Sequence, residues 1–400
     1  MKSLEKIAFF LLPLSALISE LTFVPNRILI LLCLSWVIFR DKRIINYVSK
    51  KKWLILIVVF YLIFILFSNK FLSNEAILLL TIPVYLLLYG SSSLEQFYLK
   101  KYFILATVTY SIILIASKTI SIASFGFSNF LAKKYWWNEI LYKNLTATLH
   151  GHPTYIAMFI TAAIIMMLNN QASSKKYFTS TQRVLVLTTL LSVLLLLVVK
   201  ISYLTLGVVM LFYIITLFRK NRRKEAWISL CILILTGIAV FNLSGVKQRL
   251  LNDISYFGAK EVQTDDQNRI NERAALWQSS THFIKENPII GSSFQGRSSK
   301  ESIYPLAKKL YPPLEYAKNS HNNYLEFGVR YGLPGALVFL FFIFMYLKVG
   351  VKNRSFEIIG IAVLICLFSL TESFMFREQG ISFVAIFTAI LGKQVYGKYI

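Results

Sequence analysis

Residues 184–218 read VLVLTTLLSVLLLLVVKISYLTLGVVMLFYIITLF, and Lys200 is the only charged side chain among them. A helix needs about 20 mostly apolar residues to cross the hydrocarbon core of a bilayer. The stretch is long enough for two such helices, 184–200 and 202–218, with Lys200 at the end of the first. It therefore predicts a membrane protein built from helices.

Similar apolar runs recur along the whole chain. Because each run of about 20 residues is long enough for one span, the sequence predicts an all-α polytopic membrane protein of about twelve transmembrane helices. The first run lacks a small-residue cleavage site, so we expect a helix there and not a signal peptide. The other candidate spans are 7–23, 26–40, 53–69, 74–90, 102–118, 153–169, 226–243, 333–348, 355–371 and 377–392.

The composition supports this class. Hydrophobic residues make up 56% of the chain and aromatic residues 15%, and the mean hydropathy is positive. The net charge is +24, but the basic residues lie in short loops between apolar runs, where they set topology and contact anionic membrane lipids. This distribution argues against nucleic acid as a partner. The three cysteines fall inside apolar runs and are predicted to be buried hydrophobic residues: Cys33, Cys231 and Cys366.

Lysine and arginine concentrate in every second loop, which predicts that both chain termini are cytoplasmic. Two segments, 119–152 and 243–332, then face outward. The predicted organisation is transmembrane helices 1–9 over residues 1–242, a large periplasmic loop that carries the chemistry over 243–332, and transmembrane helices 10–12 over 333–400.

The large loop should be mostly helical, because it is too long for a structureless connection. Asp266 is placed to cap a helix that begins near Asn268, and Asn287-Pro288 should end it. Three prolines should break the middle of the loop: Pro305, Pro312 and Pro313. Asp265-Asp266 is a possible divalent-metal pair, but the capping role is preferred.

Arg269 and Arg273 lie four residues apart, so they share a face of that helix. Guanidinium groups match phosphate oxygens in a fork geometry. The pair therefore suits a phosphate-bearing ligand. The alternative is a solvated helix face, or a pair neutralised by a nearby carboxylate such as that of Glu272.

His321 precedes the predicted tenth span, at the membrane boundary. A histidine there can take a proton from a hydroxyl near neutral pH. The alternative is an interfacial histidine bonded to the backbone. Lys200, at membrane depth, either extends to the interface or meets an anion.

His150-Gly151-His152-Pro153 enters the predicted sixth span, with Pro153 as the first helical residue. No acidic cluster completes a metal site there, so a structural or substrate-facing role is preferred. The sequence has no Walker lysine loop and no Gly-x-Gly-x-x-Gly after a strand. Any reaction must therefore draw its free energy from the substrate.

Two motifs resemble the O-antigen ligase family, which includes the lipid A-core O-antigen ligases and is related to the O-antigen polymerases. One is His321-Asn322-Asn323-Tyr324-Leu325 followed by Gly332. The other consists of Arg273, Trp277, Pro288 and Gly291. The resemblance covers roughly residues 150–345, and the first five spans match only in hydropathy.

The resemblance implies a metal- and nucleotide-independent glycosyltransferase of lipopolysaccharide biosynthesis in the bacterial inner membrane, with no cofactor. The donor would be a glycan on undecaprenyl diphosphate, and the acceptor a sugar hydroxyl of lipid A-core. By resemblance, His321 is the base or the group that orients the acceptor, Arg273 holds the diphosphate, and Arg269 and Lys200 assist. Tyr324 and Asn322 would support the histidine. Lys200 departs from the family's usual arginine, which weakens its assignment.

Two other functions fit parts of the pattern. A polymerase would use the same donor but another lipid-linked glycan as acceptor, and the motifs do not separate it from a ligase. A transporter of lipid-linked oligosaccharides would also need cations, but within the bilayer, where the predicted spans are nearly free of charge. An enzyme is therefore favoured over a transporter.

Overall fold

The structure is a computed structural model that describes residues 93–131, 140–169, 177–242 and 268–396, together with Phe10, Leu11, Leu14 and Leu17. Every regular element within these ranges is a helix. The helices are α7 (Ser93–Phe125), α8 (Phe127–Leu131), α9 (Tyr142–Thr146), η2 (Ala147–Leu149), α10 (Pro153–Asn169), α11 (Ser180–Leu197), α12 (Lys200–Arg219), α13 (Arg223–Asn242), α15 (Asn268–Glu286), α16 (Ser299–Leu310), α17 (Asn323–Lys352), α18 (Phe356–Thr371), η4 (Phe374–Phe376) and α19 (Glu378–Tyr396).

A helix occupies each predicted span from 102–118 onward. By length and composition, four helices can cross a membrane: Phe97–Phe125, Ser180–Leu197, Lys200–Arg219 and Asn323–Lys352. Tyr142–Leu149 and Pro153–Leu168, bent by 94°, make a fifth if they form one span. The chain is therefore a multi-pass membrane protein. The predicted spans 26–40, 53–69 and 74–90, and most of 7–23, lie outside the described residues, so the total of about twelve stays a prediction.

Two basic residues differ from their predicted positions. Lys200 is the first residue of α12, and not the last of α11, because Val198 adopts a left-handed φ of 47° and ends α11 at Leu197. Lys100 precedes the predicted span 102–118, where the sequence predicts a loop that carries basic residues, but it is buried within α7. Its ammonium lies 2.6 Å from the buried carboxylate of Glu357 on α18. This pairing offsets the cost of placing a lysine inside the bundle.

The core of the bundle forms around α10, whose residues from Pro153 to Met167 are buried. It packs against α7, α11, α12 and α18. Rings from three helices meet here, since the Phe103 ring centre lies 5.7 Å from that of Phe159 and 5.3 Å from that of Phe387. Cys366 is half-buried on α18, whereas Cys231 is exposed on α13, contrary to its predicted burial. An outward-facing apolar side chain on a membrane helix contacts lipid instead of protein.

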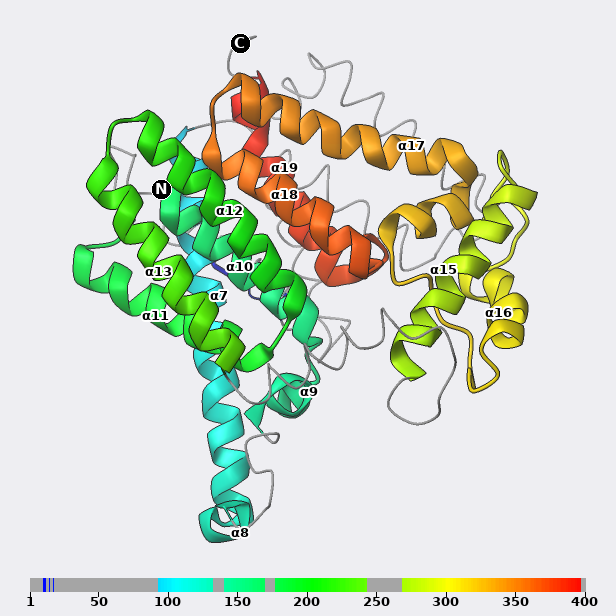
Figure 1. Cartoon of the computed structure of the whole chain (residues 1–400), viewed down its shortest axis with the longest axis horizontal. Coiled ribbons are helices and arrows are strands. Elements are labelled where there is room, and N and C mark those ends of the chain that lie inside the picture. Colours follow the sequence, from blue (N-terminus) through cyan, green and yellow to red (C-terminus); the bar gives the residue numbers. More distant parts are fainter. Residues whose placement is uncertain are drawn as a thin grey trace, which may run out of the picture.

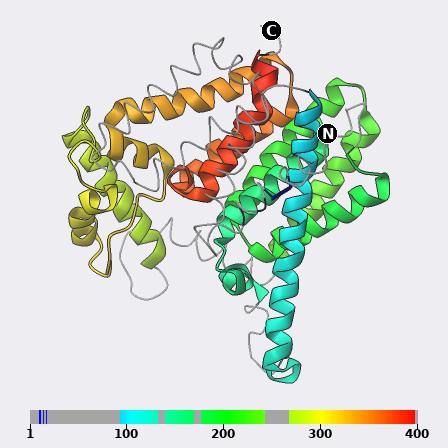
Figure 2. The same cartoon turned by 180° about the vertical axis from the view of Figure 1, so that it is seen from behind.

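A smaller lobe formed by α15 and α16 lies at one side of the bundle, against the first part of α17 (Figures 1 and 2). Its own core contains Leu276, Ile303 and Val329. Pro305 lies inside α16, so the predicted break at this proline was wrong. A capping box between Ser298 and Glu301, together with the buried Ile303, stabilises the helix across it.

The helix α17 is kinked at Gly332, whose φ of 71° is left-handed. A Cβ atom here would lie 2.6 Å from the carbonyl oxygen of Ile289, and one at Gly291 would lie 2.2 Å from the backbone of Arg330. The Leu333 N–H donates to the Pro288 carbonyl at 2.7 Å. The glycines of the two sequence motifs therefore allow their backbones to touch.

Candidate active site

His321 lies in the turn that leads into α17. Its φ of 48° is unusual for a residue with a side chain and costs roughly 1–2 kcal/mol. The His321 N–H donates to Oδ1 of buried Asn319 at 3.2 Å. Next to it, the N–H and hydroxyl of Ser320 donate to the buried Glu326 carboxylate, which also binds Arg330. These bonds hold the turn in its strained conformation.

The two asparagines after His321 fasten this turn to the end of α18. The Asn322 N–H donates to Ser373 Oγ at 3.0 Å, and its side chain donates to the Leu370 carbonyl at 3.3 Å. Asn322 also caps α17 by accepting from the Leu325 N–H. Asn323 Oδ1 accepts a hydrogen bond from the Met375 N–H at 3.2 Å. His321 is thereby placed beside the residue that follows α18, Glu372.

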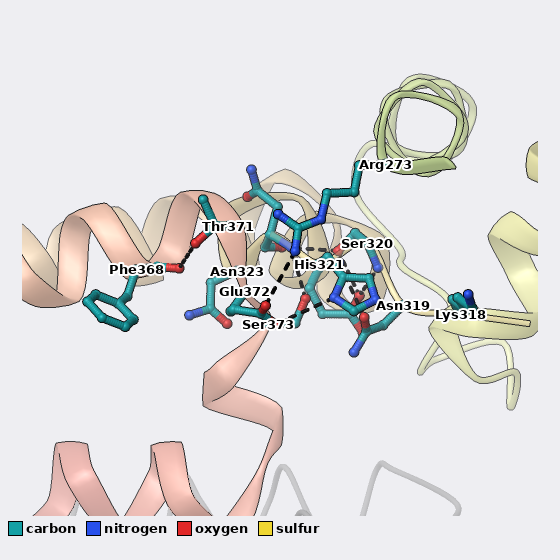
Figure 3. A network of polar contacts seen from close by, with 12 residues as sticks. Arg273, Lys318, Asn319, Ser320, His321, Asn323, Phe368, Thr371, Glu372 and Ser373 are labelled. Carbon is teal, nitrogen blue, oxygen red and sulfur yellow. Dashed lines mark hydrogen bonds and ion pairs between the residues drawn. The ribbon is translucent and has the colours of Figure 1, made fainter. Parts of the chain in front are cut away.

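Glu372 joins two of the predicted site residues (Figure 3). One carboxylate oxygen, Oε2, lies 3.4 Å from Nδ1 of His321. The other, Oε1, lies 3.5 Å from Nη2 of Arg273. The Glu372 residue is only 6% exposed. Because Nδ1 faces Glu372, the other ring nitrogen, Nε2, is left for a substrate hydroxyl.

Glu372 is ionised at neutral pH. Burial alone would raise its pKa, but the bond to His321 and the charges of His321, His152 and Arg273 outweigh burial and hold the pKa below its ordinary value. A carboxylate between an imidazole and a guanidinium orients both groups. It also stabilises the positive charge that the imidazole acquires when it accepts a proton.

Arg273 reaches this carboxylate from α15, and its side chain is 45% exposed. A half-exposed guanidinium that uses one nitrogen on Glu372 keeps other N–H groups for a ligand. Arg269 lies one turn earlier on the same helix. The predicted end of α15 before Asn287-Pro288 is confirmed. The description of this helix begins at Asn268, and Asp265 and Asp266 lie outside the described residues, so its start stays a prediction.

His152, at the entrance of α10, belongs to the same neighbourhood. Its charge acts on Glu372, and the charges of His321, Lys143 and Arg377 act on His152. Its Nδ1 is buried and makes no hydrogen bond to the described residues. His150 takes a left-handed φ of 49° and is exposed. Within the described part of the chain, no group of three or more His, Cys, Asp and Glu residues is placed to hold a metal ion.

Tyr324 lies between α17 and α18, and Lys200 lies at the start of α12. The Tyr324 hydroxyl donates to the Cys366 carbonyl at 3.1 Å, so it fastens α17 to α18 and does not bond His321. Lys200 is half-buried at the start of α12. Its role in phosphate binding stays a prediction.

Glu372 was not singled out from the sequence, although a signal was present. It directly follows the apolar run 355–371, and an ionisable group at the end of such a run often has a functional partner. Nothing in the chain pattern pointed to Arg273 as that partner, because 99 positions separate the two residues.

The O-Antigen ligase family model matches residues 184–340. The matched region begins in α11 and ends in α17, so it contains both sequence motifs and the whole of the lobe that is described. Glu372 lies beyond it. No curated protein matches the chain.

Proposed function

We propose that this membrane protein is a glycosyltransferase that moves a glycan from undecaprenyl diphosphate to a sugar hydroxyl of lipid A-core. The match of residues 184–340 to the O-antigen ligase family model supports the proposal. The reaction takes place on the periplasmic face of the inner membrane, with both termini in the cytoplasm. The observation that carries the proposal is the contact of His321 and Arg273 with the two oxygens of one carboxylate, Glu372.

In this reaction, Nε2 of His321 removes the proton from the acceptor hydroxyl. The hydroxyl oxygen then bonds to the anomeric carbon of the donor sugar. The bond from that carbon to the diphosphate breaks, and the diphosphate leaves with the electron pair. Arg273 stabilises the negative charge on the leaving group as it develops. One displacement inverts the anomeric centre, and a product that retains the donor configuration would contradict this mechanism.

The proposed reaction needs neither a metal ion nor a nucleotide. The cleaved sugar–diphosphate bond supplies the free energy. The charge of the leaving group is met by Arg273, assisted by Arg269 and Lys200. A base of this kind contributes about 10²- to 10⁴-fold to the rate.

The test is transfer in vitro. The purified full chain is mixed with a glycan linked to undecaprenyl diphosphate and with lipid A-core, in the presence of a metal chelator, and the product is identified by mass spectrometry. We expect product from the wild type and none from His321→Ala. The matched control is His282→Ala, because His282 is an exposed histidine on α15 that pairs only with Glu286 among the described residues. Equal activity of His321→Ala and His282→Ala would remove His321 from the mechanism.

A deletion strain separates ligase from polymerase. Loss of all glycan from lipid A-core indicates a ligase. A single repeat that remains attached to the core indicates a polymerase.

A further inference from the structure

A second set of cations surrounds a cavity of about 250 Å³ beside His321. Most of its wall comes from the segment between α16 and α17, Lys300 reaches it from α16, and Arg377 closes it from the end of η4. The lining residues are Lys300, Tyr316, Ala317, Lys318, Asn319, His321 and Arg377. Three of these side chains are cationic, and none of the lining residues is a carboxylate.

The protein itself neutralises this charge only in part. Lys318 lies 2.7 Å from the Glu272 carboxylate and 4.8 Å from the centre of the Tyr316 ring. In contrast, no carboxylate among the described residues forms an ion pair with Lys300 or Arg377, and both are exposed. The cavity therefore keeps two positive charges for a ligand.

The positive charge of Lys300 also does not stabilise α16, the helix to which it belongs. It lies in the first turn of α16, between Ser298 and Glu301, the two residues of the capping box. The helix dipole makes this end positive, so a cation in the first turn is unfavourable. Folding alone therefore does not account for Lys300.

We propose that this cavity binds an anionic substituent, a phosphate or a carboxylate, on the acceptor saccharide whose hydroxyl faces His321. The inference rests on the proposed function and specifies its acceptor as an acidic saccharide. Ala317 is the only small apolar residue in the lining, so the cavity offers no wall for a polyprenyl chain. Its volume of about 250 Å³ lies below the ~300–1,000 Å³ of sites for drug-sized ligands, which suits one charged sugar residue.

The position of the cavity agrees with separate sites for the donor diphosphate and for the acceptor saccharide. Arg273 faces one oxygen of Glu372 and is assigned to the donor diphosphate, whereas His321 faces the other oxygen and lines the cavity. Asn319 lines the cavity as well, and its Oδ1 accepts from the His321 N–H. A ligand here would therefore touch the residue that positions His321.

The first experiment measures binding without transfer. Glucose 6-phosphate, glucuronic acid and neutral glucose are titrated into the purified full chain at low ionic strength. We expect the two anionic sugars to bind more tightly than glucose. Lys300→Ala and Arg377→Ala should each raise their Kd about tenfold, the typical effect of losing one charge-assisted hydrogen bond. Lys309→Ala, an exposed lysine on the same helix outside the cavity, should leave the Kd unchanged. Equal affinity for glucose, or unchanged affinity in both cavity variants, would overturn the proposal.

The second experiment assigns the cavity to acceptor or donor. Transfer is measured with a phosphate-bearing core acceptor and with the same acceptor after phosphatase treatment. Phosphate removal should raise the acceptor KM about tenfold for the wild type, and much less for Lys300→Ala, because the phosphate and the lysine contribute to the same interaction. The donor KM should not change. A higher donor KM with an unchanged acceptor KM would assign the cavity to the diphosphate and overturn the proposal. If the wild type transfers no glycan at all, the proposed function fails, while the binding experiment still decides whether the cavity takes an anionic sugar.

Discussion

Glu372→Gln tests the arrangement of the site most directly. The substitution keeps the size of the side chain and removes the charge between His321 and Arg273. At the 3.4 Å that separates the His321 ring from Glu372, a pair of unit charges at an effective dielectric constant of about 20 interacts by about 5 kcal/mol. The His321 side chain is 30% exposed, so solvent reduces this value, and we take about half of it. A loss of about 2.5 kcal/mol in the transition state corresponds to a rate lower by nearly two orders of magnitude, about 100-fold.

The assay is steady-state transfer with the purified variant, which separates kcat from KM. We expect kcat to fall about 100-fold, because the imidazolium formed by proton transfer loses its carboxylate partner. The donor KM should stay the same or fall, since Arg273 no longer shares its charge with Glu372. Glu315→Gln is the matched control, because Glu315 is an exposed glutamate in the segment between α16 and α17. This reasoning would be refuted by a folded Glu372→Gln variant that keeps the wild-type kcat. It would also be refuted if the loss of activity came entirely from a higher KM.

Three further predictions follow from single positions. Lys200→Arg should preserve transfer and Lys200→Ala should reduce it if the residue binds phosphate, and an unchanged rate for Lys200→Ala would favour a lysine that only extends to the interface. Gly332→Ala should lower the melting temperature by an amount equivalent to more than about 1 kcal/mol, because of its φ of 71° and the 2.6 Å approach of its Cβ to the Ile289 carbonyl oxygen. Gly207→Ala, with open space around the added Cβ, should not lower the melting temperature. Equal melting temperatures for Gly332→Ala and Gly207→Ala would contradict this account. The pKa of Glu372 is lower in the folded protein than in the unfolded chain, where it is about 4.3. The ionised carboxylate therefore stabilises the fold at any pH above the unfolded pKa. This stabilisation is lost as the pH falls through the folded pKa. The difference in melting temperature between the wild type and Glu372→Gln should therefore be largest near pH 7 and shrink on acidification, and a difference independent of pH would count against it.

The helices could be predicted closely because bilayer thickness fixes the length of an apolar run. The ends of the helices were less predictable. The left-handed Val198 that moved Lys200 to α12 has no sequence signal, since valine rarely adopts a positive φ. Lys100 was misplaced because a partner such as Glu357, 257 positions away, is invisible to hydropathy.

The candidate site could be predicted only where local motifs exist. His321 and Arg273 were found through their spacing from neighbouring residues and through resemblance. The sequence analysis did not identify Glu372, Lys300 and Arg377, because only the tertiary structure brings each of them next to the other site residues. The O-antigen ligase match over residues 184–340 ends before Glu372, so the family pattern could not supply it either.

The contact between the two sequence motifs explains how the proposed site residues His321 and Arg273 are held at a fixed position relative to each other. Arg273 belongs to α15, in the lobe, whereas His321 is fastened to the end of α18 in the bundle. The position of Arg273 over Glu372 thus depends on how the lobe sits on α17. That placement is fixed where Gly291 and Gly332 allow the chain after α15 to touch α17, with the Ser292 N–H donating to the Val329 carbonyl at 2.8 Å. A shift of the lobe by one side-chain width would separate Arg273 from Glu372, whose contact at 3.5 Å is already long. We therefore expect the motif glycines to affect the proposed reaction through the placement of Arg273.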